Sequence, residues 1–130
     1  MNKIDYEERA KVYTDALDTF GPTKQLVKAL EELTEVQLEI CRALDGRASM
    51  THLAEEVADA TIMLEQVRQI FGINAEVCQF MDAKVLRLRG RVEQERGRVA
   101  LRRSFLEKGL QIPRTYADDD KTKSGLLEED

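Results

Sequence analysis

The chain is poor in the residues that build turns, disulfide frameworks and aromatic-rich sheets. Its 130 residues include seven glycines, two prolines, two cysteines and no tryptophan, and aromatic residues make up 5%. Sandwiches and barrels need many turn residues, so this composition argues against them. Wholesale disorder is also excluded, because 42% of the residues are hydrophobic. The remaining composition, rich in Leu, Ala, Val and charged residues, is typical of helices.

Histidine and cysteine are too scarce for most sites that bind soft metals. His52 is the single histidine, which excludes two-His–carboxylate sites and argues against a di-iron carboxylate bundle. Cys41 and Cys78 lie far apart without a Cys-x-x-Cys spacing, so they do not form a zinc site by themselves. Both are predicted to be buried thiols. Any catalysis is therefore expected to use carboxylates, lysine and arginine.

Long apolar runs and a leader pattern are also absent. No apolar run approaches the roughly 18 residues of a membrane span, and Met1–Glu8 does not read as a signal peptide. These features predict a soluble, cytoplasmic protein that does not contact a membrane. Arginines are frequent over residues 87–103, but the formal net charge of −5 and the few aromatic residues argue against nucleic-acid binding.

Turn and capping residues divide the chain into four expected helices, at about 5–20, 22–44, 50–71 and 74–108. Gly21 ends the first helix, Ser49 or Thr51 caps the third, and Asn74 caps the fourth. Gly90 and Gly97 are expected to weaken the fourth helix and to bend it or end it early. The predicted fold is all-α, a four-to-five-helix bundle in one domain over residues 1–112. An acidic tail over residues 113–130 is expected to be disordered.

Apolar residues follow one stripe on each of the two middle helices. The first stripe consists of Leu26, Leu30, Leu33, Gln37, Ile40 and Leu44, and the second of Leu53, Val57, Ala60, Leu64, Val67 and Phe71. A short connection predicts that these helices pack antiparallel, with the stripes in their interface. A second apolar face on the third helix, with Ala54, Ala58 and Ile62, predicts that an oligomer completes the bundle.

Two pairs of carboxylates stand at the edges of these stripes. Glu32 and Glu35 are i,i+3 neighbours on the second helix, and Glu56 and Asp59 are i,i+3 neighbours on the third. The helical wheel places Glu56 in an apolar arc, whereas adjacent Glu55 falls on a polar side together with Gln66 and Gln69. A carboxylate in an apolar arc needs a cation or a raised pKa. The pattern fits a Mg²⁺ or Mn²⁺ site, and a surface ion-pair network is the open alternative.

The fourth helix carries a basic pair. Lys84 and Arg87 are i,i+3 neighbours, with Arg91 one turn further. This arrangement is either an ordinary basic helix face or a clamp for phosphate oxygens, to which guanidinium and ammonium groups are suited. Carboxylates that hold a metal, together with basic groups that hold phosphate, would indicate metal-assisted phosphoryl chemistry. A glycine-rich loop of the Walker type is absent, so a P-loop enzyme is excluded.

These motifs resemble the MazG-like, all-α nucleoside triphosphate pyrophosphohydrolases. The family pattern EExxE, followed at a distance by ExxD, is met by Glu31, Glu32 and Glu35 and then by Glu56 and Asp59. A later helix reading like KFxRRFxxVE is similar to residues 84–93, although Leu88 stands where a second arginine is common. The Gly-x-x-x-Gln segment from Gly21 to Gln25, which leads into the second helix, is also similar to the family pattern. The resemblance covers residues 20–93.

The resemblance implies hydrolysis of a nucleoside triphosphate between the α and β phosphates, giving a monophosphate and pyrophosphate. Glu32, Glu35, Glu56 and Asp59 match the family's catalytic metal ligands for Mg²⁺, with Mn²⁺ possible as a substitute, while Lys84 and Arg87 match its phosphate-binding positions. Residues 60–64 lack the aromatic and histidine of the related phosphoribosyl-ATP enzymes, which argues against that substrate. Assembly as a homodimer or tetramer is implied as well. A non-catalytic interaction or regulatory module of the same fold is the alternative.

Overall fold

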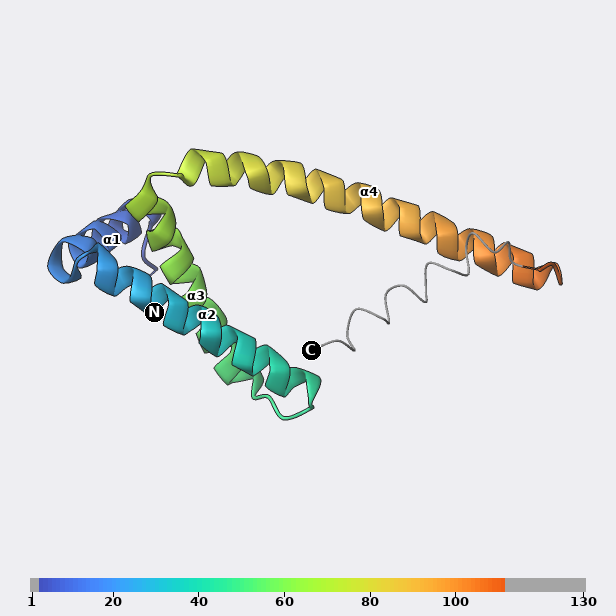
Figure 1. Ribbon diagram of the computed structural model, residues 1–130, viewed down its shortest axis with the longest axis horizontal. Helices are drawn as coiled ribbons and strands as arrows, with labels where there is room; N and C mark the ends of the chain where they lie inside the picture. Colours follow the sequence, from blue (N-terminus) through green and yellow to red (C-terminus); the bar gives the residue numbers. More distant parts are fainter. Residues whose placement is uncertain (1–2, 112–130) are drawn as a thin grey trace. The chain divides into compact units, whose positions relative to one another are not determined.

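Every regular element that the structure describes is a helix. The computed structural model describes residues 3–111, which form α1 (Tyr6–Phe20), α2 (Pro22–Leu44), α3 (Met50–Phe71) and α4 (Asn74–Glu107) (Figure 1). The all-α prediction is therefore confirmed for this range. The chain divides into two units, with the boundary between Cys78 and Gln79 inside α4. The expected disordered tail, residues 113–130, lies outside the described residues.

The helix ends follow the capping residues that the sequence places there. The Ser49 hydroxyl accepts a hydrogen bond from the His52 backbone N–H at 3.3 Å and so caps α3. Gly72, in the left-handed conformation with φ 64°, ends the same helix. Asn74 was predicted to cap α4 from the position before the helix. It is instead the first helical residue of α4, a difference of one residue. Gly90 and Gly97 do not end α4, which continues to Glu107.

The helices α2 and α3 pack antiparallel, as predicted, but through a face rich in polar residues. The Gln25 amide, early in α2, donates a buried hydrogen bond to Gln66, late in α3, at 2.7 Å. At the other end of the pair, Glu39 of α2 contacts His52 of α3. The buried residues of α2 are Gln25, Ala29, Glu32 and Glu39, and those of α3 are Ala60, Met63 and Gln66. Small and polar side chains therefore form this contact.

The prediction that the leucine stripe of α2 packs on α3 was wrong. Leu30 and Leu44 are 66% and 84% exposed, and Val57, Leu64 and Phe71 of the α3 stripe are exposed as well. Gln66, expected on a polar side, is buried. The physical reason is that hydrogen-bonded glutamines and paired carboxylates can occupy a helix interface when every polar group has a partner. Much of both apolar stripes is left exposed, although Ala60 of the α3 stripe is buried and Leu26, Leu33, Leu53 and Val67 are half-buried.

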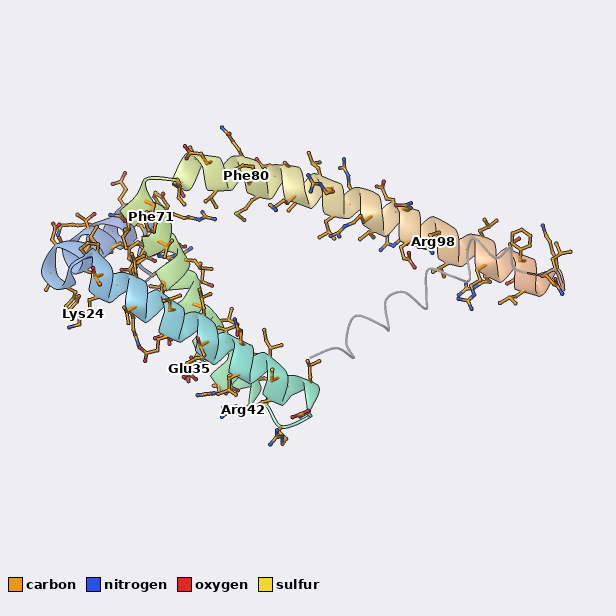
Figure 2. All side chains as sticks on the ribbon, in the orientation of Figure 1. Lys24, Glu35, Arg42, Phe71, Phe80 and Arg98 are labelled. Atoms are coloured by element: carbon orange, nitrogen blue, oxygen red, sulfur yellow. The ribbon has the colours of Figure 1, made fainter. Side chains whose placement is uncertain are left out.

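The remaining helices differ in how they are held. In the first unit α1 contacts α2, and it is joined to α3 by the Gln69 amide, which donates to the Thr14 hydroxyl at 2.7 Å. The described residues of the second unit form a single helix, the later part of α4, whose side chains project on several sides (Figure 2). No residue of the described α4 is buried. A single helix has no core of its own and is marginally stable alone.

The cysteine prediction was also wrong. Cys41 and Cys78 are free thiols, and both are exposed. Cys41 follows Ile40, which is also exposed, on α2. Within the described range, none of the helices combines the length and the apolar character that a bilayer crossing requires.

Candidate functional site

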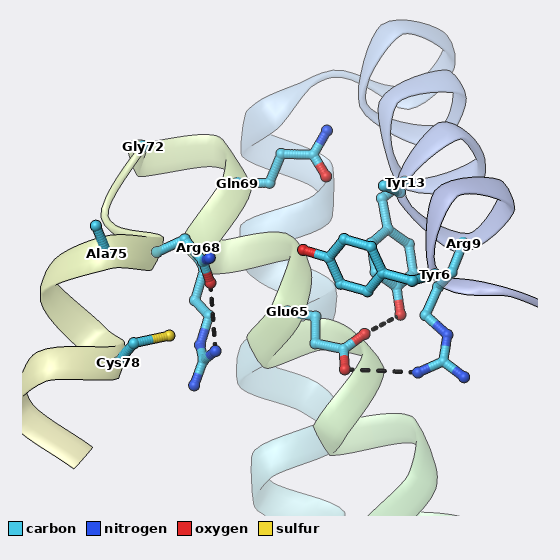
Figure 3. A pocket seen from close by; sticks show the side chains of 11 residues that line it. Tyr6, Arg9, Tyr13, Glu65, Arg68, Gln69, Gly72, Ala75 and Cys78 are labelled. Atoms are coloured by element: carbon cyan, nitrogen blue, oxygen red, sulfur yellow. Dashed lines mark hydrogen bonds and ion pairs between the residues drawn. The ribbon is translucent and has the colours of Figure 1, made fainter. Parts of the chain in front are cut away.

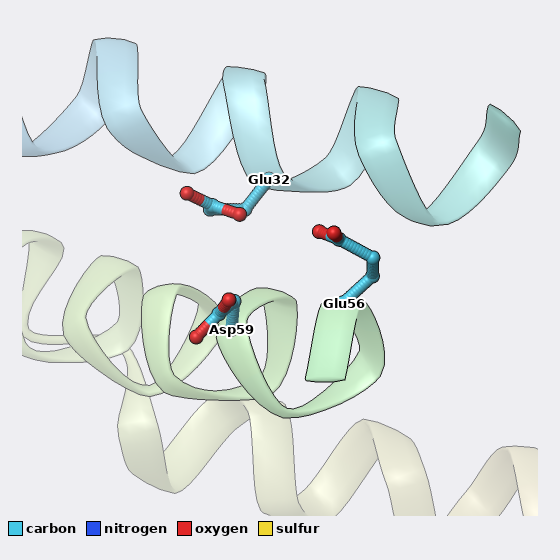
Figure 4. A group of neighbouring side chains, drawn as sticks. All are labelled: Glu32, Glu56 and Asp59. Carbon is cyan, nitrogen blue, oxygen red and sulfur yellow. The ribbon is translucent and has the colours of Figure 1, made fainter. Parts of the chain in front are cut away.

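Three of the four predicted metal-ligand carboxylates meet between α2 and α3. Glu32 of α2 and Glu56 and Asp59 of α3 each offer one oxygen, and these oxygens lie within 4.8 Å of one another. Figure 4 shows the three side chains directed into the space between the two helices. Glu32 is buried at 7% exposure, Glu56 is half-buried and Asp59 is exposed. The cluster thus has one buried wall and one side open to solvent.

Glu32 also has a basic neighbour on its own helix. The Lys28 ammonium lies 2.5 Å from a Glu32 carboxylate oxygen and 3.4 Å from one of Glu31. The hydrogen bond to Glu32 is the largest of the effects that raise the pKa of Lys28 above its usual value. Lys28 therefore supplies positive charge at the edge of the cluster and partly offsets the repulsion between its carboxylates.

On the other side of the cluster, Glu56 contacts His52. The Nε2 atom of His52 lies 3.3 Å from a Glu56 oxygen, and its Nδ1 atom lies 3.2 Å from an oxygen of Glu39. Glu39 also pairs with Arg42. Burial alone would raise the pKa of Glu39, but the hydrogen bonds from Arg42 and His52 outweigh it and hold that pKa below the usual range. Both carboxylates therefore have defined partners on the protein.

The donors in the cluster suit a hard divalent cation. All three are carboxylates from two different helices, and no histidine or cysteine is among them. Mg²⁺ and Mn²⁺ prefer oxygen ligands, and Mg²⁺ is commonly held by a few carboxylates together with substrate phosphates. The open side at Asp59 leaves room for such a substrate. The residues present therefore fit the predicted cation.

The other predicted site residues lie elsewhere. Glu35 is half-buried one turn after Glu32 on α2 (Figure 2) and is not a member of the group of three. Lys84 and Arg87 are exposed on α4, in the second unit of the chain. The first unit alone thus assembles the three carboxylates. Glu55, next to Glu56, is exposed, as predicted from its wheel position.

We expect Lys28→Gln to increase the response of the protein to Mg²⁺. Lys28 competes with a cation for Glu32, so its removal should strengthen cation binding while lowering the Tm of the metal-free protein. Thermal melting with and without Mg²⁺ measures both effects, and the Mg²⁺-induced rise in Tm should be larger in the variant than in the unsubstituted protein. Lys24→Gln is the matched control. Lys24 lies one turn before Lys28 on α2, and its ammonium lies over the Phe20 ring. Equal Mg²⁺ responses in all three proteins would contradict the expectation.

A pocket of about 720 Å³ lies between α1, α3 and the first turns of α4, within the first unit. Its lining includes Tyr6, Arg9, Tyr13, Glu65, Arg68 and Cys78 (Figure 3). The Tyr13 hydroxyl donates to Glu65, and Arg9 lies 3.7 Å from the other oxygen of that carboxylate. These contacts join α1 to α3. Sequence reasoning missed this pocket, although Tyr6, Arg9 and Tyr13 share one face of α1 by their spacing.

We expect Tyr13 to titrate well above the usual range of a tyrosine. Burial, followed by the hydrogen bond to Glu65, raises its pKa from 10.0 to about 12. Because the folded pKa is the higher one, the stability that the protonated hydroxyl contributes is complete below pH 10 and is lost as the pH rises toward 12. Phenolate absorbance should show a late transition that is absent in Tyr13→Phe and retained in Tyr6→Phe. A folded protein without this late transition, or one in which Tyr13→Phe leaves it unchanged, would show that Tyr13 is not held in this way.

Comparison with known proteins adds no support for a function of this site. No family model, no curated protein and no solved structure matches the chain. The site therefore rests on the sequence motifs and on the arrangement of Glu32, Glu56 and Asp59. His52 was missed by the sequence reasoning as a member of the site; its i,i+4 spacing to Glu56 was the available signal.

Proposed function

We propose that the protein is a cytoplasmic, Mg²⁺-dependent nucleoside triphosphate pyrophosphohydrolase, which cleaves between the α and β phosphates to give a monophosphate and pyrophosphate. The observation that carries this proposal is the meeting of Glu32, Glu56 and Asp59, from the two acidic motifs, within 4.8 Å. Two motifs of one family pattern, distant in sequence, supply the same small cluster. A shared cation would account for this convergence.

The roles of the residues follow from their chemistry. Glu32, Glu56 and Asp59 would hold Mg²⁺ or Mn²⁺, and Glu35, at a matching motif position, would add a ligand. When bound, the cation supplies positive charge that offsets the charge on the phosphate oxygens. Lys84 and Arg87 would bind phosphate oxygens, as the resemblance implies. The buried side of the cluster, around Glu32, limits access of water to the carboxylates and strengthens their attraction for a cation.

The exposed apolar stripes support a homo-oligomer, either a dimer or a tetramer. The apolar residues buried in the described chain are Tyr13, Ala29, Ala60 and Met63, which is a small core for helices of this length. The leucine stripe of α2 and the apolar residues of α4 remain outside it. Exposed apolar faces mark interaction sites, and a second copy of the chain would bring the same apolar faces to cover them.

We expect light scattering at micromolar concentration to give at least twice the chain mass of 14.9 kDa. Leu30→Glu or Leu44→Glu should shift the mass toward that of the monomer, because each substitution places a charge in the apolar stripe. Thr23→Glu, at an exposed position early in the same helix, is the control. A clean monomer for the unsubstituted protein would remove the oligomer from the proposal.

One observation favours the alternative, a non-catalytic helical interaction module. Lys28 and His52 each contact one member of the cluster, as they would in a purely structural ion-pair network. The discriminating experiment is a screen of ribo- and deoxynucleoside triphosphates for pyrophosphate release, with Mg²⁺ and without it. Release of pyrophosphate that depends on Mg²⁺ supports the enzyme. No release from any nucleotide by the oligomeric protein supports the interaction module.

A further inference from the structure

His52 lies between two carboxylates from different helices. It occupies the first turn of α3, where its backbone N–H is fixed by the Ser49 cap. One ring nitrogen faces Glu39 of α2 at 3.2 Å, and the other faces Glu56 of α3 at 3.3 Å. The imidazole ring thus joins the cluster of three carboxylates to a buried group on the neighbouring helix.

Glu39 provides a fixed point for this ring. It is 1% exposed, and it is the largest side chain in the described chain that is fully buried. Arg42, one turn later on α2, pairs with the same Glu39 oxygen that faces His52. A buried carboxylate that loses its partners is left with an uncompensated charge, so Glu39 is strongly held to Arg42 and His52. The position of the His52 ring is therefore determined by α2 as well as by its own helix.

Glu56 needs such support more than Glu32 does. Glu32 is packed into the helix interface, whereas the Glu56 side chain is only half-buried and has three rotatable bonds. A contact with a ring that is itself fixed restricts those bonds. Residues that hydrogen-bond to metal ligands orient them in this way, and their loss typically weakens metal binding by 10- to 100-fold.

We infer that His52 is a positioning residue, which holds the Glu56 carboxylate in the orientation that binds the cation and is itself held by Glu39 and, through it, by Arg42. This inference rests on the proposed function, since it takes Glu56 to be a metal ligand. His52 does not bind the cation or the substrate. Its contribution is to reduce the conformational freedom that Glu56 would otherwise lose on binding.

Mn²⁺ binding, followed by the electron paramagnetic resonance signal of the free ion, tests this role without reference to activity. His52→Ala should weaken Mn²⁺ binding by roughly 10- to 100-fold, and Glu39→Gln should weaken it in the same direction. His52→Gln, whose amide can still donate one hydrogen bond, should recover part of the affinity. Arg47→Gln is the control, because it breaks the Asp45–Arg47 ion pair in the adjoining loop without touching Glu56.

A second measurement uses the unsubstituted protein and so does not depend on a variant that folds. The chain has one histidine, so its ring nitrogen resonances are unambiguous. They should shift on addition of Mg²⁺, and the shift should saturate together with binding.

The outcomes separate the two proposals. Mn²⁺ binding by His52→Ala that equals or exceeds that of the unsubstituted protein, or a ring that does not respond to saturating Mg²⁺, would overturn the positioning role and leave the metal site intact. Tighter binding would show that His52 competes with the cation for Glu56, as Lys28 does for Glu32. Failure of the unsubstituted protein to bind Mn²⁺ at all would overturn both the positioning role and the metal site.

Discussion

Replacement of Glu56 by Gln should reduce Mg²⁺-dependent pyrophosphate release by roughly 100- to 1000-fold, the loss typical when a group that stabilises charge is removed from an active site. The amide keeps the shape of the side chain but has no negative charge with which to bind a cation. The same change should leave the metal-free protein as stable as before or more stable, because it relieves repulsion from Glu32 and Asp59. Pyrophosphate release and thermal melting without metal are the paired measurements.

Adjacent Glu55 is the matched control for this substitution. It is exposed and has the same side chain on the same turn of α3, so Glu55→Gln should change little in either assay. Equal effects of the two substitutions would contradict the assignment of Glu56. So would a Glu56→Gln protein that melts early but still turns over, since that combination would identify a structural ion pair with His52.

Removal of the metal should abolish activity completely. The three clustered carboxylates have no bound cation to share after exhaustive chelation, and phosphate oxygens approaching them would meet only negative charge. Activity should return on addition of Mg²⁺ or Mn²⁺. The same titration should raise the Tm, because Mg²⁺ at about 100 times its Kd stabilises the folded state by about 2.7 kcal/mol.

Glu56→Gln is also the control for the chelation experiment. Its Tm should respond much less to Mg²⁺ than that of the unsubstituted protein, which excludes a general effect of salt on stability. Turnover that persists after chelation in the unsubstituted protein would eliminate the metal site.

The helices could be predicted from sequence because their ends are determined locally. Gly21 and Pro22 separate the first two helices, while Ser49 and Gly72 delimit the third, and each acts through its own backbone geometry or side chain. The range of α4 was also predicted closely, but the early end that Gly90 and Gly97 left open does not occur. A glycine in a helix interior lowers stability by about 1 kcal/mol, which neighbouring good helix formers offset.

The faces by which the helices pack could not be predicted in the same way. The α2 sequence has two candidate faces, the leucine stripe and the face of Gln25, Ala29, Glu32 and Glu39. Hydrophobicity favours the first, yet the second is buried, since Gln25 finds its partner in Gln66 and Glu39 finds partners in Arg42 and His52. Such pairing depends on the other helix and is not visible in α2 alone.

The candidate site could be predicted only in part, because it too depends on how the helices pack. Helical spacing brings Glu56 near Asp59, but only the packing face decides that Glu32, and not Glu35, joins them. The sequence reasoning used His52 only to exclude metal sites, because its partner Glu39 lies on another helix. Cys41 was expected to be a buried thiol, whereas it is exposed on α2.

The central claim is tested most directly by the products formed from a nucleoside triphosphate. ³¹P NMR of the purified protein with Mg²⁺ and each nucleotide in turn resolves monophosphate, diphosphate, pyrophosphate and orthophosphate. We expect one or more nucleotides to give equal amounts of monophosphate and pyrophosphate, with turnover by Glu56→Gln reduced by roughly 100- to 1000-fold. Release of diphosphate and orthophosphate, or products that form equally with Glu56→Gln, would contradict the account.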